Sequence, residues 1–363
     1  MSAVPIVLLS SFALLVSFYA LHRVTDHYFV DSLEIISKRL RMTSDIAGAT
    51  LMAMGSSAPE LFTSMLALIK GMEYASLGAG TIVGSAIFNV LVIIGASVYL
   101  HQSLLTWQPV VRDLSFYILS ILLLYWVFQD GVITFNESVY FIVLYLIYLV
   151  ALPVWRRILP YEDQADSVPN IVREEEISFE KKHHKLLLIL KPVDMICALV
   201  IPSVAKHPRL YVVTFASSIL MIAALSWVLV EAGVILATTL GIPDAIIGLT
   251  ILAVGTSVPD LIASMVVARR GKGDMAVSNA IGSNIFDILI GLGAVWMIMI
   301  YVNGESIIIS IDNLGGSVML LIATVASLLF LLLVNRWTIG RKSGMVLIGL
   351  YCAYIVSIVM GWL

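Results

Sequence analysis

Two short phrases of the sequence, 200 residues apart, each place an acid directly after a proline. The first reads Gly55-Ser56-Ser57-Ala58-Pro59-Glu60, and the second reads Gly255-Thr256-Ser257-Val258-Pro259-Asp260. Each lies in a stretch apolar enough to cross a bilayer, where an ionisable side chain is costly unless something pairs with it. Two such acids in matched halves of one chain indicate a transporter built from repeats around a central ion site.

The prolines leave backbone oxygens free beside these acids. Proline has no N–H, so Pro59 removes the helical partner of the Gly55 carbonyl. Pro259 does the same for Gly255. In hydrocarbon, such carbonyls must be satisfied by protein, water or a ligand. We therefore expect a broken helix at the midplane in each half, with free carbonyls available to a cation.

The candidate ligands around the two phrases all offer oxygen. Hydroxyl groups precede the acids, and neighbouring helices add an amide and a third carboxylate. No Cys or His lies nearby, which favours hard cations such as Na⁺ and Ca²⁺ over zinc or copper. Ca²⁺ accepts mixed oxygen ligands in a flexible geometry, whereas Mg²⁺ loses water reluctantly. The candidates are Glu60, Asp260, Ser56, Ser57, Thr256, Ser257, Asn89 and Asp287.

The charge of the acids suggests a mechanism. Glu60, Asp260 and Asp287 facing one cavity cannot all stay ionised without cations, because repulsion and desolvation oppose it. Either Ca²⁺ or several Na⁺ could neutralise most of that charge, so binding of Ca²⁺ and binding of Na⁺ should exclude each other. A shared site open alternately to each side would let the Na⁺ gradient expel Ca²⁺. We expect a transporter rather than an enzyme, with these ions as substrates, no cofactor and no nucleic-acid partner.

The composition is that of a polytopic membrane protein. Of the 363 residues, 60% are hydrophobic and 12% are charged, and the mean hydropathy is +1.01. A soluble chain of this length needs more polar surface. The run from Val4 to Leu21 lacks a basic region and a clear cleavage site, so we interpret it as a retained span. Cys197 and Cys352 lie in separate apolar segments and predict neither a disulfide nor a metal site.

Ten stretches are long enough to span as helices, since a span needs about 20 residues. The predicted fold is an all-α membrane protein in which 1–155 is a first five-helix repeat, 156–209 a cytoplasmic loop and 210–363 a second repeat. The expected spans lie near 3–21, 44–69, 76–100, 113–129, 138–155, 210–230, 244–268, 276–301, 315–334 and 344–362.

Basic residues orient these spans. With both termini outside, Lys70 is the one of the 21 Lys and Arg residues that falls outside, and Arg112 and the long central loop lie inside. This bias is a strong positive-inside signal. Five helices per half make the second half enter from the opposite side, so the repeats are inverted. We expect a multi-pass protein of the plasma membrane with its central loop in the cytoplasm.

The internal repeat extends beyond the acidic phrases. The run Gly84-Ser85-Ala86-Ile87-Phe88-Asn89 matches Gly282-Ser283-Asn284-Ile285-Phe286-Asp287 after a contraction of two residues. Packing is an alternative role for the small residues, because Gly and Ser let membrane helices approach closely. Packing and ligation both remain open for Ser64, Ser264, Gly84 and Gly282. Asn89 could form an interhelical hydrogen bond, and Thr50 and Thr250 could cap carbonyls.

The two phrases resemble the alpha repeats of the calcium/cation antiporter superfamily. The runs Val83–Asn89 and Gly273–Ser278 are most similar to potassium-dependent sodium/calcium exchangers, which makes K⁺ a further candidate substrate. Asp260 stands where many prokaryotic relatives have Glu, which favours that branch. Loop 156–209 shows no Ca²⁺-sensor domain of the kind some animal exchangers carry.

The resemblance implies roles for individual residues. Glu60 and Asp260 would be the central ligands shared by Ca²⁺ and Na⁺. Backbone oxygens would come from Ala53 and Ala253, and residues of the flanking helices would complete the site. The implied set is Glu60, Asp260, Ser56, Ser57, Thr256, Ser257, Ala53, Ala253, Ser85, Asn89, Ser283 and Asp287.

Three other functions are compatible with parts of the sequence. In a proton-coupled cation exchanger, protonation of Glu60 or Asp260 would replace Na⁺ binding. Gly271-Lys272-Gly273-Asp274 matches the Gly-x-Gly-Asp signature of intramembrane aspartyl proteases, but it lies in a basic inside loop without a Tyr-Asp partner motif. A passive channel fits broken helices in inverted repeats less well than a transporter does.

Overall fold

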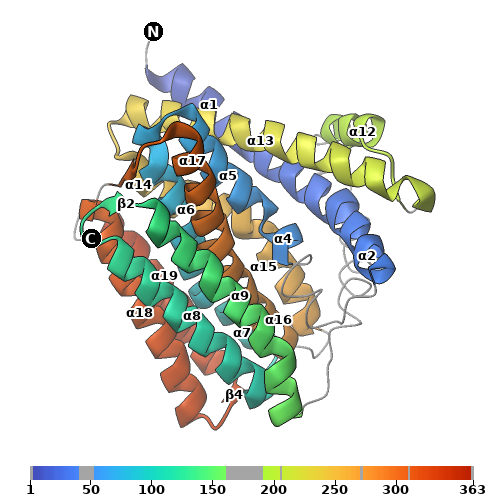
Figure 1. Ribbon diagram of the computed structural model, residues 1–363, viewed down its shortest axis with the longest axis vertical. Coiled ribbons are helices and arrows are strands. Elements are labelled where there is room, and N and C mark those ends of the chain that lie inside the picture. Colours follow the sequence, from blue (N-terminus) through green and yellow to red (C-terminus); the bar gives the residue numbers. More distant parts are fainter. Residues whose placement is uncertain are drawn as a thin grey trace.

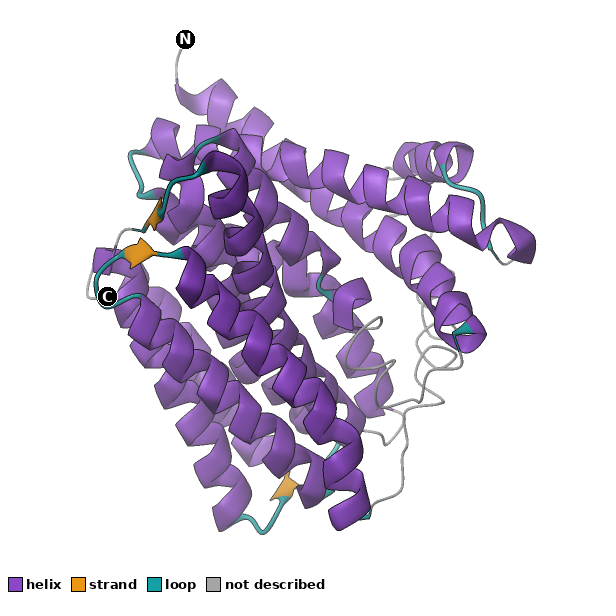
Figure 2. Ribbon diagram, in the orientation of Figure 1, coloured by secondary structure: helices purple, strands orange, loops and turns teal. Residues whose placement is uncertain are grey.

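The chain folds almost entirely into helices, in a computed structural model that describes residues 3–40, 53–160, 191–204, 207–269, 273–309 and 311–360. Within these ranges, eight helices are long and apolar enough to cross a membrane, and Asp244–Val258 is a shorter apolar helix. Four two-residue strands join helix ends (Figure 2). The prediction of a helical, multi-pass fold is therefore confirmed.

One continuous rod opens the chain and extends past the predicted end of the first span at 21. It comprises α1 (Ala3–Val24), the π-helix η1 (Thr25–Phe29) and α2 (Val30–Arg39), and we call it the N-terminal rod. Polar residues inside the rod have partners, which explains why the helix continues. His22 Nδ1 lies 2.9 Å from Asp26 Oδ2, and Arg23 Nε lies 2.8 Å from Asp194 Oδ1.

The N-terminal rod packs along one other long helix, α13 (Tyr211–Leu240), which follows the short η6 (Pro208–Leu210). Phe29 stacks on Phe215 between them, with ring centroids 5.4 Å apart. Figure 1 shows this pair along one side of the molecule, away from the outer helices of the opposite side. The pair contributes to a second buried apolar cluster, which also includes Ala58, Leu77 and Leu252 of neighbouring helices.

The two acidic phrases fold differently. The first is broken at Ser57, between α4 (Ala53–Ser56) and α5 (Ala58–Lys70), as predicted. The second runs through α14 (Asp244–Ile247), the π-helix η7 (Gly248–Leu252) and α15 (Ala253–Arg269), and α15 continues past Pro259. The expectation of a matching break in the second half is wrong, because its helical irregularity is a π-turn upstream of the phrase.

The centre of the molecule holds two helices with matching π-turns. The first runs through η3 (Met72–Tyr74), α6 (Ala75–Phe88), η4 (Asn89–Ile93) and α7 (Ile94–Leu100). The second comprises α16 (Gly273–Phe286), η8 (Asp287–Leu292) and α17 (Gly293–Asn303). Single π-turns in α-helices occur often at functional sites. Here they begin at Asn89 and Asp287, two of the predicted ligands.

Four outer helices complete the fold, namely α8 (Trp107–Val127), α9 (Phe135–Ile158), α18 (Ile311–Val334) and α19 (Arg341–Val359). Strand β1 (Ser103–Leu104) pairs antiparallel with β4 (Thr338–Ile339), and β2 (Val132–Ile133) pairs with β3 (Ile307–Ile308). The outer helices expose large apolar side chains such as Leu146, Val150 and Phe330. Such an apolar exterior is suited to lipid.

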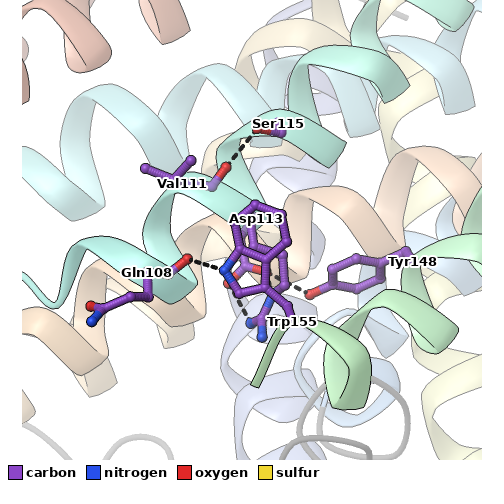
Figure 3. Close-up of polar contacts among 7 residues, drawn as sticks. Gln108, Val111, Asp113, Ser115, Tyr148 and Trp155 are labelled. Carbon is purple, nitrogen blue, oxygen red and sulfur yellow. Dashed lines mark hydrogen bonds and ion pairs between the residues drawn. The ribbon is translucent and has the colours of Figure 1, made fainter. Parts of the chain in front are cut away.

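A polar cluster fixes one end of the α8–α9 pair and corrects the predicted position of Arg112 (Figure 3). Arg112 was expected in an inside loop, but α8 begins earlier and buries it. Its Nε donates to Asp113 Oδ1 at 2.7 Å, and its Nη2 donates to Oδ2 at 3.1 Å. Tyr148 of α9 donates to the same carboxylate, and Trp155 Nε1 donates to the Gln108 carbonyl at 2.9 Å. The neighbouring carboxylate makes burial of the guanidinium tolerable.

The predicted loop 156–209 contains a helix, α12 (Lys191–Val200). Tyr19 donates to Asp194 of α12 at 3.1 Å, beside the ion pair of Asp194 with Arg23. This segment is therefore attached to the N-terminal rod. Residues 161–190 lie outside the described part of the chain.

Candidate functional site

Side chains from both halves of the chain meet around Glu60. Ser257 Oγ of α15 donates to Glu60 Oε1 of α5 at 3.3 Å. Ser257 Oγ also lies 2.8 Å from Ser85 Oγ at the end of α6. All three residues are buried. The structure thus brings the first acidic phrase, the second phrase and a flanking helix to one place.

The other two acids lie close to this point. Asp287, the first residue of η8, is 2% exposed, and its charge interacts with those of Glu60 and Asp260. Ser57, in the break between α4 and α5, lies beside Asp287. Asp260 is partly exposed. The three carboxyl groups that the sequence singled out are therefore electrostatic neighbours.

The acids do not converge on a single point. In the described ranges, no three Asp, Glu, His or Cys side chains gather closely enough to hold one metal ion. The three carboxylates are therefore not grouped around one ion position, while their sharing of one cavity stays a prediction. One cation would take ligands from one or two carboxylates and from surrounding hydroxyl, amide and carbonyl oxygens.

Several oxygens at this site are buried without a hydrogen-bond donor. They are Glu60 Oε2, Asp287 Oδ1, Ser57 Oγ and Asn89 Oδ1. A buried polar atom without a partner costs free energy, and most such atoms in folded proteins are paired. Four of them on adjacent elements offer the oxygen ligands that Na⁺ and Ca²⁺ require. This group of atoms fits a hard cation.

Asn89 has both of the roles that the sequence left open. Its Nδ2 donates to Asn284 Oδ1 at 2.8 Å, which is an interhelical hydrogen bond. Its Oδ1 is buried without a partner. The nitrogen of the Asn89 amide is therefore held by Asn284, and its oxygen is free to accept a ligand.

The remaining hydroxyls bond to their own helices. Thr256 Oγ1 donates to the Leu252 carbonyl at 3.0 Å, and Ser283 Oγ donates to the Ala280 carbonyl at 3.3 Å. Thr250 Oγ1 donates to the Ile246 carbonyl at 2.6 Å, as expected of a cap. A hydroxyl that donates to a carbonyl keeps lone pairs for a cation. Ser56 is partly buried, and Ala53 and Ala253 begin α4 and α15. Thr50 lies outside the described residues.

The small residues separate into two groups. A Cβ on Gly84 would lie 2.3 Å from the Leu249 carbonyl oxygen, so this position serves close helix packing. A Cβ on Gly282, its equivalent in the repeat, would meet nothing within 4 Å. Ser64 packs against Gly78, where an added Cβ would lie 2.9 Å from the Ser64 Cα. Ser264 is buried in α15.

Asn284 and Tyr117 hold the site in place, and neither was predicted from the sequence. Asn284 is fully buried, and its Nδ2 donates to Tyr117 Oη at 3.0 Å and to the Ala86 carbonyl at 3.3 Å. Asn284 also accepts the hydrogen bond from Asn89 described above. The available signal was in the repeat itself, because Asn284 stands where the first copy has Ala86.

Asn284→Ala is expected to loosen the site. The substitution leaves the Asn89 amide and the Tyr117 hydroxyl buried without their partner, at a cost of about 1–3 kcal/mol. We expect a lower unfolding temperature and weaker Ca²⁺ binding, measured by a thermal melt with and without Ca²⁺. Asn303→Ala on an exposed helix end is the matched control. Equal melts and equal Ca²⁺ responses for the two variants would contradict the assigned role.

The comparison with known proteins identifies the family. The model of the sodium/calcium exchanger protein family matches residues 10–153 and 210–360. The chain belongs to this family. The sodium/potassium/calcium exchanger 4 of Mus musculus is 30% identical, and the match covers 98% of this chain and 81% of that protein. The sodium/potassium/calcium exchanger 5 of Homo sapiens is 32% identical over 91% of this chain and 78% of that protein.

Solved structures of exchangers share the fold. The sodium-calcium exchanger NCX_Mj has a TM-score of 0.58 at 23% identity, covering 97% of this chain and 99% of that chain. The H⁺/Ca²⁺ exchanger CAX has a TM-score of 0.68 at 16% identity, covering 98% and 82%. The family and its relatives are exchangers and not enzymes, which confirms the transporter prediction over the intramembrane protease.

Proposed function

We propose that this exchanger is an antiporter that moves Na⁺ in one direction and Ca²⁺ in the other. The observation that carries the proposal is the group of buried, donorless oxygens from both halves of the chain, beside three acids whose charges interact. A Ca²⁺ ion or several Na⁺ ions would satisfy these oxygens and relieve the repulsion. Because Ca²⁺ and Na⁺ use the same oxygens, they compete for the site. Competition at a site that opens alternately to each side of the membrane gives exchange.

The buried oxygens around Glu60 support a ligand set drawn from the two phrases and their flanking helices. Glu60 and Asp260 supply the central carboxylates, and Asp287 supplies a third beside them. Hydroxyl, amide and backbone oxygens complete the coordination without a resident cofactor. The proposed ion ligands are Glu60, Asp260, Asp287, Asn89, Ser56, Ser57, Thr256, Ser257, Ser85, Ser283 and the backbone oxygens of Ala53 and Ala253.

The strand pairs support an architecture of ten spans in two inverted five-helix repeats, 1–155 and 210–363, joined by loop 156–209. If β1 corresponds to β3 and β2 to β4, then the pair β1–β4 becomes the pair β3–β2 when the halves are exchanged. This is the pattern of a two-fold axis. Strands β2 and β4, which connect equivalent helices, lie at opposite ends of the bundle (Figure 1). Inverted repeats of this kind are suited to alternating access.

The charge pattern supports a location in the lipid bilayer of the plasma membrane, with both termini outside and loop 156–209 in the cytoplasm. K⁺ is a proposed co-substrate, because the similar curated proteins are named sodium/potassium/calcium exchangers. The second candidate is H⁺ in place of Na⁺, which the structural likeness to an H⁺/Ca²⁺ exchanger keeps open.

A flux assay with the purified chain in proteoliposomes tests these alternatives. We expect an outward Na⁺ gradient to drive Ca²⁺ uptake, because the two ions compete for the same oxygens. If K⁺ shares the site, uptake will rise when K⁺ accompanies Ca²⁺ and stay low when choline replaces it. Uptake driven by a pH gradient without a response to Na⁺ would instead establish proton coupling.

A further inference from the structure

The N-terminal rod crosses both acidic phrases. The Phe18 ring lies against Gly255, where an added Cβ would be 2.0 Å from the ring. Further along the rod, Val30 and Leu33 pack against Gly55, at 3.1 and 3.2 Å from the position of a Cβ. Each glycine begins one acidic phrase. The part of the rod between Phe18 and Val30 therefore passes the level of the two acids that end these phrases.

That part of the rod contains an acid that the proposed ligand set does not use. Asp26 lies in the π-turn η1, and its charge interacts with that of Asp260. Its side chain is 24% exposed, whereas Asp287 is 2% exposed. Asp26 is thus a partly exposed neighbour of Asp260, and both are more accessible than Asp287.

One neighbour of Asp26 is His22, which is cationic only when its imidazole is protonated. Its Oδ2 lies 2.9 Å from His22 Nδ1, one helical turn away. The nearby Arg23 guanidinium is instead 2.8 Å from Asp194 of α12. Two like charges held on separate helices repel each other, and a cation between them converts this repulsion into attraction on both sides.

We propose that Asp26 is an additional cation ligand, which receives the transported ion from Asp260 on the route toward the side of loop 156–209. This inference rests on the proposed function, since it concerns the path of the exchanged Ca²⁺. The rod contacts both halves of the site, so its position relative to α15 determines whether Asp26 can share an ion with Asp260. Asp26 then acts as a step between the buried oxygens and water.

The alternative is that Asp26 has only a structural role and stabilises the helix through its contact with His22. The two roles make opposite predictions for His22→Ala. If the pair only stabilises the helix, His22→Ala and Asp26→Asn remove the same contact and should change Ca²⁺ binding equally. If Asp26 binds the ion, His22→Ala leaves the carboxylate available, and only Asp26→Asn weakens Ca²⁺ binding.

The test measures the KM for Ca²⁺ on each side of oriented membrane vesicles, with orientation assigned by protease access to loop 156–209. We expect Asp26→Asn to raise the KM about tenfold on the loop side, equivalent to ~1.4 kcal/mol. The KM on the opposite side should change little. Asp26→Glu retains the carboxylate and should restore most of the affinity. Asp31→Asn, on the same rod, is the matched control, and thermal melts establish that each variant is folded.

Each other result overturns a stated claim. Equal KM values for the parent and a folded Asp26→Asn protein, with Na⁺-driven flux intact, would overturn the role of Asp26 and leave the proposed function standing. An equal KM increase in His22→Ala and Asp26→Asn would show that Asp26 acts only through its structural contact with His22. A parent protein with no Na⁺-driven Ca²⁺ flux would overturn the proposed function together with this inference.

Discussion

Replacing Glu60 with Gln is expected to lower Na⁺-driven Ca²⁺ exchange by about 100-fold or more. The amide preserves the size of the side chain and the contact of Ser257 with its oxygen, but it removes a charge buried among unpaired oxygens. When a cation is bound, Glu60 and the ion form a buried charge pair, and removing one partner of such a pair costs about 3–5 kcal/mol. That energy corresponds to a factor of about 100 or more in an equilibrium constant. The measurement is initial Ca²⁺ uptake by proteoliposomes at saturating and at limiting Ca²⁺.

Asp260→Asn should behave in the same way, because Asp260 is the charged neighbour of Glu60 in the second phrase. Glu305→Gln makes the same chemical change at an exposed position and should retain full exchange. Melting curves must show that both site variants are folded. Exchange at the parental rate in either folded variant would remove that acid from the set of ion ligands.

The acids of the site could be predicted from sequence because the free-energy cost of burying a carboxylate in an apolar span does not depend on how the helices pack. A carboxylate in an apolar span is expensive wherever its helix packs, so Glu60 and Asp260 stood out before any contact was known. The internal repeat then drew attention to the position shared by Asn89 and Asp287. The structure places these acids within electrostatic reach of one another.

The supporting contacts could not be predicted, because they depend on how each helix is rotated and tilted. Asn284 and Tyr117 lie 167 residues apart, and nothing in either segment shows that one side chain reaches the other. The same holds for the Phe18 ring on Gly255. The residues of these two contacts have no matching pair in the other half of the sequence. The internal repeat therefore could not predict either contact.

Helix ends and breaks were the least predictable features. Apolar composition ended the first span near Leu21, yet the rod continues because His22 and Arg23 have acidic partners. The same reasoning placed Arg112 in a loop, although Asp113 allows its burial. Such pairs are invisible to a hydropathy pattern, which counts each charge separately.

Gly84→Ala is expected to destabilise the folded chain strongly. Its Cβ would lie 2.3 Å from the Leu249 carbonyl oxygen and 2.7 Å from the Ala253 Cβ, where α6 crosses η7 and α15. Gly80 and Gly248 meet backbone at the same crossing, so the helices have no flexible side chain that could move aside. Overpacking typically costs about 1–3 kcal/mol, and a clash with backbone lies at the upper end. We expect a clearly lower unfolding temperature and reduced exchange, because Ala253 begins the helix that carries Asp260.

The repeat supplies a matched control for this substitution. Gly282 occupies the equivalent position in the second half, and a Cβ there would meet no atom within 4 Å. Gly282→Ala should therefore melt close to the parent temperature, and the added methyl could stabilise it by about 0.5–1 kcal/mol through the lower helix propensity of glycine. Thermal melts of the two purified variants in the same detergent check the difference. If both variants melt alike, the close approach of α6 to α15 is not what requires glycine at position 84. A large loss in Gly282→Ala alone would place the tight helix crossing in the other half.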